Sequence, residues 1–463
     1  MTTTDILAHL DANEDAIRAR YFDLLRIPSV SAQPAHADDC RRAAEWLREE
    51  LTAIGFMTEV RETAGHPVVV AHHPGPGGNV PHLLYYGHYD VQPAEPYELW
   101  TSPPFEPTTL DGPNGPRTVA RGAVDDKGQV MMWLSALRSC HEVAGGPPCR
   151  ISVLIEGEEE VGSPSLDAFL AQHAADLKPA DIVVVSDTNM WDARTPAITT
   201  RLRGMAYAQI DLYAASRDLH SGLYGGNALN PINLLSRILG GMHDENGRIT
   251  LDGFYDAVPP IPNALAQQWH DLNFDERRFL GEIGLSTPSG EKGLPALQRM
   301  WARPTCDVNG IWGGYTGEGS KTVIAAEAHA KVSFRLVGYQ DPHAIFDSLE
   351  RFVKERIPED ARVEIQRFGA APPVTVDEDS RWVAAARRVL TEEFGKPPVM
   401  AGSGGSIPVV ASFKTILGLD SLLIGFGLDD DAVHSPNEKF DWACLMHGAR
   451  SHARLLAELG GKA

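Results

Sequence analysis

Apolar residues recur with helical spacing in two stretches at the start of the chain, residues 4–25 and 37–54. In the second stretch, Ala43, Leu47 and Leu51 are spaced by one helical turn. Gly55 follows directly, at the position where a glycine commonly ends a helix. We therefore expect two helices to open the chain.

Short apolar runs rich in β-branched residues come next, and they predict strands at 66–73, 82–86, 151–155 and 182–185. Several of these runs are continuously apolar and do not alternate, which is typical of strands buried on both faces. Helical stretches at about 126–144 and 164–175 lie between them. This alternation predicts an α/β fold, with a largely parallel sheet covered by helices.

The pattern changes at Gly204. Residues 205–213 and 327–337 alternate between polar and apolar, as in strands with one exposed face, and residues 230–241 have helical spacing. We interpret residues 204–372 as an inserted α+β domain that ends at a Pro-Pro break.

The first pattern resumes after this break, with a helix near 379–394, a buried strand near 421–426 and a helix at about 440–459. Residues 1–203 and 373–463 are therefore predicted to form one domain.

Composition is consistent with two domains and limits the classes of partner that we expect. A chain of 463 residues exceeds what one hydrophobic core usually supports. The 62 acidic and 41 basic residues give a net charge of −21, which argues against nucleic acid and anionic membranes as partners. Five scattered cysteines without a CxxC motif favour a reducing compartment. The start of the chain lacks the features of a secretory signal, so we expect a cytoplasmic protein.

Polar residues follow three of the predicted strands directly. His88 and Asp90 come after the strand at 82–86, residues 156–160 contain four glutamates after the strand at 151–155, and Asp187 follows the strand at 182–185. Ligand crevices in open α/β sheets form at the carboxyl ends of the strands. These side chains are therefore expected to converge at one edge of the sheet.

Each of these residues alone has an ordinary interpretation, as a surface histidine or a solvated acidic loop. Together they would bring several carboxylates into one crevice, which is electrostatically costly unless cations are bound. Imidazole and carboxylate are ligands of zinc and related ions, and catalytic sites keep a position open for water. The sequence therefore favours a metal site.

Six motifs, in this order along the chain, connect these residues to a known family. They are His-Tyr-Asp-Val-Gln-Pro (88–93), Arg-Gly-Ala-Val-Asp-Asp-Lys-Gly (121–128), Glu-Gly-Glu-Glu-Glu-Val-Gly-Ser (156–163), His-Ser-Gly-Leu-Tyr-Gly-Gly (220–226), Gly-Gly-Ser-Ile-Pro (404–408) and Val-His-Ser-Pro-Asn-Glu (433–438). Over nearly its whole length the chain resembles the two-metal aminoacylase and carnosinase peptidase family. The motifs are most similar to those of cytosolic nonspecific dipeptidases.

The resemblance implies a pair of divalent ions, which we expect to be zinc, with manganese or cobalt as alternatives. One ion would be held by His88 and Asp187, the other by Glu160 and His434, and Asp125 would bridge both. The resemblance also implies a cis peptide bond between residues 125 and 126.

Two further acidic residues acquire roles from the resemblance. Asp90 would not bind a metal ion itself, but it would contact the ring of His88 and fix its orientation. Glu159 would be the general base, which takes a proton from the attacking water and returns it to the leaving amine.

Residues of the inserted domain would complete the site. The resemblance implies that His220 reaches into the partner subunit of a homodimer and stabilises the oxyanion, so that the inserted domain is both lid and dimerisation domain. Arg335, on the polar face of an alternating strand, would bind the terminal carboxylate of the substrate. Ser406, in a glycine-rich loop, would contact the substrate as well. Relatives of the dipeptidase type commonly carry Arg-Glu before this loop, whereas this chain has Gly402-Ser403.

We therefore predict a di-metal dipeptidase that cleaves the amide bond of dipeptides or short peptides with a free terminal carboxylate. An N-acyl amino acid deacylase, of the aminoacylase or desuccinylase type, is the alternative within the family. A non-catalytic metal-binding interaction protein is the alternative from another class. The presence of Glu159 and of all five predicted ligands favours catalysis.

Overall fold

The computed structural model describes residues 2–405 and 407–461. By its internal contacts the chain forms two compact units, and each is described by itself. The first unit comprises residues 1–200, 376–401 and 412–463, and the second comprises residues 201–375 and 402–411. Residues 402–411, which the sequence assigned to the first domain, are thus grouped with the second unit. The backbone of Arg203 explains part of this grouping, because its N–H donates to the carbonyl of Gly405 at 3.2 Å.

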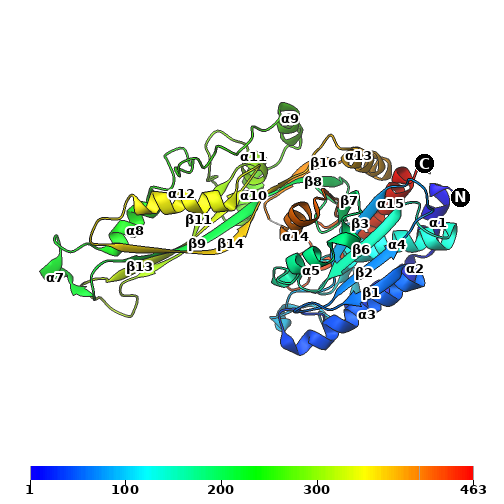
Figure 1. Cartoon of the computed structure of the whole chain (residues 1–463), viewed down its shortest axis with the longest axis horizontal. Helices are drawn as coiled ribbons and strands as arrows, with labels where there is room; N and C mark the ends of the chain where they lie inside the picture. The colour runs from blue at the N-terminus through cyan, green and yellow to red at the C-terminus, as the bar shows by residue number, and fades with distance from the viewer. Residues whose placement is uncertain (1, 406, 462–463) are drawn as a thin grey trace. The chain divides into compact units, whose positions relative to one another are not determined.

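A sheet forms the centre of the first unit, with its strands in the order β1-β2-β6-β3-β7-β17-β8 and with β16 also paired to β8. The strands are β1 (Met57–Arg61), β2 (Val68–His73), β3 (His82–His88), β6 (Arg150–Glu156), β7 (Ile182–Val185), β8 (Ala197–Leu202), β16 (Val399–Ser403) and β17 (Ser421–Leu423). The short strand β15 (Val374–Thr375) pairs with Leu202 and Arg201 at the end of β8, and all four of these residues belong to the second unit. Strands β6, β3, β7 and β17 pair in parallel, whereas β1, β2 and β8 pair antiparallel with their neighbours. The α/β fold class is confirmed, and the parallel pairing is concentrated at the centre (Figure 1).

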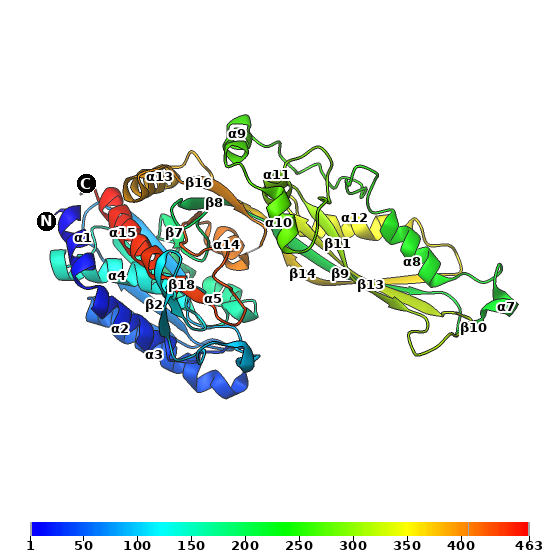
Figure 2. The same cartoon turned by 180° about the vertical axis from the view of Figure 1, so that it is seen from behind.

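Helices surround this sheet, and Figure 2 shows the long helices α4 and α15 beside each other. The helices of the first unit are α1 (Thr3–Ala12), α2 (Glu14–Leu25), α3 (Ala37–Ala53), α4 (Lys127–Ala144), α5 (Leu166–Gln172), α6 (Ala174–Leu177), α13 (Arg381–Phe394) and α15 (Trp442–Leu459), and α14 (Pro408–Ser412) lies at the boundary of the units. A small antiparallel sheet adds β4 (Thr108–Gly112), β5 (Gly115–Val119) and β18 (Lys439–Asp441). None of the helices described has the length and apolar character that crossing a lipid bilayer requires.

Two predicted helices are interrupted. The stretch 4–25 breaks at Asn13, which ends α1 and precedes α2, because its side chain bonds back to the carbonyl of His9. The stretch 164–175 divides into α5 and α6 at His173. In both places a polar residue stands inside an otherwise helical pattern, so the apolar spacing alone did not reveal the break.

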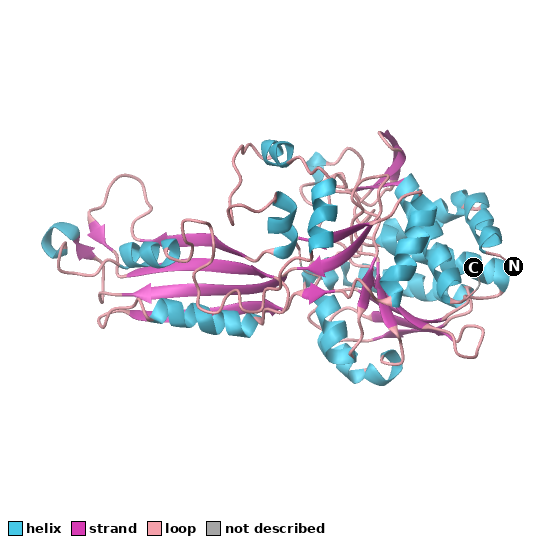
Figure 3. Ribbon diagram, turned by 90° about the horizontal axis from the view of Figure 1, so that it is seen from above, coloured by secondary structure: helices cyan, strands magenta, loops and turns pink. Residues whose placement is uncertain are grey.

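The second unit contains a four-stranded antiparallel sheet in the order β11-β13-β9-β14 (Figure 3). Its strands are β9 (Gly204–Tyr213), β11 (Thr305–Gly313), β13 (Glu327–Leu336) and β14 (Arg362–Ala371), and β10 (Leu219–His220) pairs with β12 (Val323–Ile324). Its helices are α7 (Ser221–Tyr224), α8 (Pro231–Gly240), α9 (Asn263–Asp271), α10 (Glu276–Glu282), α11 (Ala296–Ala302) and α12 (Pro342–Lys354). This confirms the predicted α+β character of the segment.

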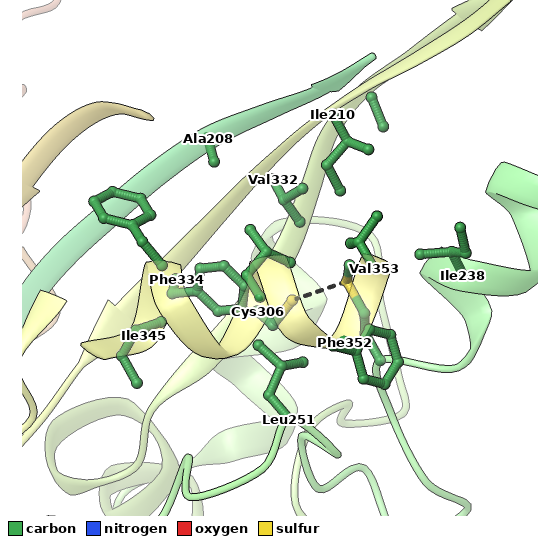
Figure 4. Close-up of a cluster of buried hydrophobic side chains, with 14 of the residues drawn as sticks. Ala208, Ile210, Ile238, Leu251, Cys306, Val332, Phe334, Ile345, Phe352 and Val353 are labelled. Carbon is green, nitrogen blue, oxygen red and sulfur yellow. Dashed lines mark hydrogen bonds between the residues drawn. The ribbon is translucent and has the colours of Figure 1, made fainter. Parts of the chain in front are cut away.

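Alternation determines which face of the second sheet is covered. Ala208, Ile210, Val332 and Phe334 point toward α8 and α12 and form one buried core with them (Figure 4). Residues at the intervening positions, among them Arg335, lie on the opposite face and are partly exposed. The side chain of Arg335 is therefore placed on the face that its sequence pattern predicts.

Candidate metal centre

The parallel strands bring the predicted ligands to one edge of the first sheet. His88 is the last residue of β3, and Glu160 lies in a short 3-10 turn, Glu159–Val161, just after β6. Asp187 comes two residues after the last residue of β7, and Asp125 comes two residues before the first residue of α4. His434 lies in the loop between β17 and β18.

These five residues form two adjacent groups that share one aspartate. In the first group, ligand atoms of His88, Asp125 and Asp187 lie within 4.8 Å of one another. In the second group, the same is true of Asp125, Glu160 and His434. The arrangement that the resemblance implied, with Asp125 between two sites, is thus present in the geometry.

Individual distances show how closely the two groups meet. Nε2 of His88 lies 3.1 Å from Oδ1 of Asp125, and Nε2 of His434 lies 3.0 Å from Oδ2 of the same carboxylate. Nε2 of His434 is also 3.1 Å from Oε2 of Glu160. Each carboxylate oxygen of Asp125 therefore faces a different imidazole.

The ring of His88 fits a metal ligand because of its tautomer. Its Nδ1 lies 3.1 Å from the backbone carbonyl of Asp90, which can only accept, so Nδ1 carries the proton. Nε2 then presents a lone pair toward the carboxylate of Asp125. Among the described residues, this buried nitrogen has no hydrogen-bond partner of good geometry. A cation between the ring and the carboxylates would satisfy it.

Asp90 supports the site chiefly through the turn that follows β6. Its carboxylate accepts the backbone N–H groups of Glu159 and Glu160 at 3.2 and 3.1 Å, and the hydroxyl of Ser31 at 2.6 Å. The carboxylate also lies 3.4 Å from Nδ1 of His88, farther than the carbonyl of the same residue. Asp90 therefore contacts both His88 and the turn that carries Glu159 and Glu160.

Burial and neighbouring charge shift the protonation of the cluster. Burial, together with nearby carboxylates, raises the pKa of Asp187 to about 7 and that of Glu159 to about 8. Although burial alone would raise the pKa of Asp125, the hydrogen bond from His434, together with the nearby ring of His88, holds it well below its usual range. Hydrogen bonds to Asp125 and Glu160 raise the pKa of His434 to about 10. The crevice thus favours positive charge, as a pair of cations would supply.

The loop that carries Asp125 is fixed by Glu438, which the sequence did not single out. The Glu438 carboxylate accepts backbone N–H groups of Gly122, Val124 and Asp125 at 2.8, 2.9 and 3.1 Å. It also accepts from the guanidinium of Arg121 at 2.8 Å. The signal was available, because Glu438 closes the motif that contains His434. The peptide bond between Asp125 and Asp126 is cis, as the resemblance implied.

Gln92 is a second supporting residue that the sequence did not single out. Its amide donates to Oε2 of Glu160 at 2.8 Å and to the carbonyl of the same residue at 3.1 Å. Gln92 also lies in a quoted motif, four residues after His88.

The remaining predicted residues belong to the second unit. His220 is exposed at the start of α7, where Nδ1 of its ring accepts the N–H of Gly222 at 3.0 Å. Arg335 lies on β13, and its positive charge adds to burial in lowering the pKa of Arg203. Ser406 lies outside the described residues, although the neighbouring glycines are described.

Comparisons with known proteins agree with this geometry. The family model described as peptidase family M20/M25/M40 matches residues 84–458. The Cys-Gly metallodipeptidase DUG1 of Candida albicans is 31% identical over 92% of this chain and 91% of its own length. The human Beta-Ala-His dipeptidase is 30% identical over 81% of this chain and 74% of its own length.

A solved structure extends the similarity to the fold. The M20 family metallo-carboxypeptidase Sso-CP2 from Sulfolobus solfataricus superposes with a TM-score of 0.81 at 28% identity. The match covers 96% of this chain and 99% of that structure. The prediction of a metallopeptidase is therefore confirmed, and the chain belongs to peptidase family M20/M25/M40.

Proposed function

We propose that this protein is a two-metal hydrolase that cleaves the amide bond of dipeptides or short peptides next to a free terminal carboxylate. One observation carries the proposal: two groups of imidazole and carboxylate ligands meet at Asp125. The similar proteins are two dipeptidases and a carboxypeptidase by name, which supports a substrate that ends in a free carboxylate.

In this proposal, His88 and Asp187 hold one divalent ion, Glu160 and His434 hold the other, and Asp125 contacts both. Bound ions of this kind lower the pKa of a water molecule toward neutrality and polarise a carbonyl group. Two imidazoles with three carboxylates suit zinc, and we propose zinc as the native ion.

Glu159 is proposed as the proton carrier. It lies beside the proposed ligand Glu160, in the short turn that follows β6. It accepts the proton of the attacking water, and it then donates this proton to the amine of the departing residue. Asp90 fixes the backbone of Glu159 and thereby positions the carboxylate.

The second unit is proposed to bind the substrate. The guanidinium of Arg335 pairs with the terminal carboxylate, and Ser406 contacts the same end of the substrate. His220 stabilises the oxyanion in the active site of a partner subunit, which makes the active enzyme a homodimer. The exposure of His220 at the start of α7 supports a role outside its own unit. Five free and buried cysteines support the proposed cytoplasmic location.

A substrate panel on metal-stripped and zinc-reloaded protein tests the proposed function. We expect hydrolysis of L-Ala-L-Leu only in the reloaded sample, and faster than hydrolysis of N-acetyl-L-leucine or N-succinyl-L-leucine. Faster turnover of the acyl compounds would overturn the dipeptidase assignment in favour of a deacylase. Full activity after complete metal removal would overturn the metal-dependent mechanism itself.

A further inference from the structure

His434 lies in an exposed loop whose backbone conformation needs support from other parts of the first unit. Its side chain is 54% exposed, whereas the side chains of Asp125 and Glu160, which it meets, are 13% and 4% exposed. The backbone of His434 has a φ of 60°, and Ala432 has a φ of 53°. Residues other than glycine keep this left-handed conformation only where surrounding contacts fix it. We therefore looked for the contacts that hold this loop.

Asp431 closes the base of the loop. Its carboxylate accepts the backbone N–H of Leu428 at 2.7 Å, and its own N–H donates to the carbonyl of Leu428 at 3.1 Å. On the other side, the N–H of Lys439 donates to the carbonyl of Asp431 at 3.0 Å. Asp431 therefore joins the two ends of the loop, and His434 is carried by residues 432–438 between them.

The ammonium group of Lys439 holds this base from the buried side. Lys439 lies on β18, which pairs with β5, and its side chain is 3% exposed. Its Nζ lies 2.6 Å from Oδ1 of Asp431, 3.0 Å from Oδ1 of Asp430 and 3.3 Å from Oδ1 of Asp441. Asp431 and Asp441 are buried, and buried carboxylates are strongly destabilised when their cation is removed. The shape of the base therefore depends on Lys439.

Asn437 holds the exposed side of the same loop. Its Nδ2 donates to the carbonyl of Leu99 at 2.8 Å, and its Oδ1 accepts the N–H and the hydroxyl of Thr101 at 2.7 and 2.8 Å. Between the two anchors, the N–H of Ser435 donates to the carbonyl of Ala432 at 2.9 Å, which closes a turn that contains His434. The loop is thus fixed on two sides of this turn.

We propose that Lys439 and Asn437 position His434 to hold its metal ion. Both act through the loop, so they are positioning residues and not ligands. The inference rests on the proposed function, which supplies the ion. Glu438 differs from them, because it accepts N–H groups from the loop of Asp125 and so supports the residue that contacts both ions. Loss of the Lys439 or Asn437 side chain should therefore weaken one ion site and spare the other.

Zinc titration of metal-stripped protein tests this selectivity. Lys439→Met keeps a long side chain and removes the charge. We expect it to bind one ion as the wild type does and the other about 10- to 100-fold more weakly, the usual effect of losing a residue that supports a metal ligand. Lys414→Met is the matched control, because it breaks an exposed ion pair with Asp420 in the same unit and should bind both ions normally. Wild-type affinity for both ions in Lys439→Met, or equal weakening of both, would overturn the inference.

Asn437→Gly provides a second variant with little risk to folding. Asn437 has a φ of 67°, which glycine adopts freely, so the substitution removes the bonds to Leu99 and Thr101 but suits the backbone. We expect the ion beside His434 to bind about three- to tenfold more weakly, as the loss of partly exposed hydrogen bonds implies. In crystals of either variant, anomalous scattering at the zinc edge should show lower occupancy beside His434. Lower occupancy beside His88 instead, or no difference, would contradict the inference.

Hydrogen exchange of the metal-free protein separates this inference from the proposed function. In Lys439→Met, the amides of Leu428 and Ser435, which are hydrogen-bonded within the loop, should exchange at least tenfold faster than in the wild type. The amides of residues 121–128 should be unchanged. Unchanged exchange at Leu428 and Ser435 would overturn the inference even if the protein hydrolyses dipeptides. Faster exchange there, in a protein that binds no pair of zinc ions, would support the positioning of the loop and contradict the proposed function.

Discussion

The two units place polar side chains by different means. In the first unit, His88, Glu160 and Asp187 lie where central parallel strands end or just beyond, so a single sheet edge collects them. In the second unit, Arg335 and Thr305 lie along antiparallel strands, on the face opposite α8 and α12. Strand ends gather charges into a small buried cluster, whereas a strand face spreads them along a surface. The first arrangement suits a metal centre and the second suits a substrate.

Loss of the proposed base should give the largest effect, and only in the first unit. We expect Glu159→Gln to lower kcat by a factor of about 10² to 10⁴, because proton transfer is lost, while both metal ions stay bound. Glu158→Gln is the control, since the side chain of Glu158 points toward Gly65. Kinetics and metal analysis of both variants check this.

The Glu159→Gln variant also tests whether two subunits contribute residues to one active site. An inactive Glu159→Gln protein mixed with His220→Ala should regain part of the activity if His220 serves the partner subunit. A mixture that remains as inactive as its components would contradict the shared site.

Removal of the Glu438 carboxylate, which supports the loop that carries Asp125, should have the next largest effect. Glu438→Ala leaves a buried arginine and three backbone N–H groups without their partner. We expect a loss of about 3–5 kcal/mol in the free energy of unfolding, measured by urea titration. Metal affinity should fall about 10- to 100-fold, because Asp125 loses its support. Unchanged affinity would mean that Asp125 is held in place without Glu438.

A methyl group at the loop of the second unit should have a smaller effect. Gly402→Ala would push against Trp301, and overpacking of this kind costs about 1–3 kcal/mol. Gly405→Ala is the matched control, because the nearest atom to its added Cβ is Oγ of Ser403 at 3.6 Å. The thermal unfolding midpoints of both variants check this. Equal midpoints would show that Trp301 can shift to make room for the methyl group without loss of stability.

A buried histidine should have no effect on stability at neutral pH, and its effect should appear only on acidification. Burial lowers the pKa of His452 to about 3, and its ring bonds to Tyr85 and Ser186. As the pH falls below about 6.5, this histidine binds a proton in the unfolded state but not in the folded state. The free energy of unfolding therefore falls by at most about 1.4 kcal/mol per pH unit. The loss continues toward pH 3. His452→Gln should show a flatter decline of the thermal midpoint between pH 7 and pH 5, and an identical decline would assign the effect to other groups.

The sequence predicted what local pattern controls and missed what distant contacts create. Continuous apolar runs located β3, β6 and β7, and the strand-end rule then located three of the proposed metal ligands. Strand β1 was not predicted, because Met57–Arg61 is short and its side chains are mostly polar. Asp125 and His434 lie in loops, and only motif resemblance connected them with the strand-end ligands.

The supporting contacts were beyond the reach of sequence patterns. Glu438 meets the backbone of Asp125 across 313 positions of sequence, and no local pattern encodes such a pairing. Glycine at 402 could be noted as a departure, but its contact with Trp301 requires the folded chain.

The most direct test of the account is to locate metal ions in crystals of the zinc-loaded protein by anomalous scattering at the zinc edge. The account predicts two peaks per chain, one contacted by His88 and Asp187 and the other by Glu160 and His434, with Asp125 between them. A single peak, or peaks away from Asp125, would contradict the two-metal centre on which the proposed hydrolysis depends.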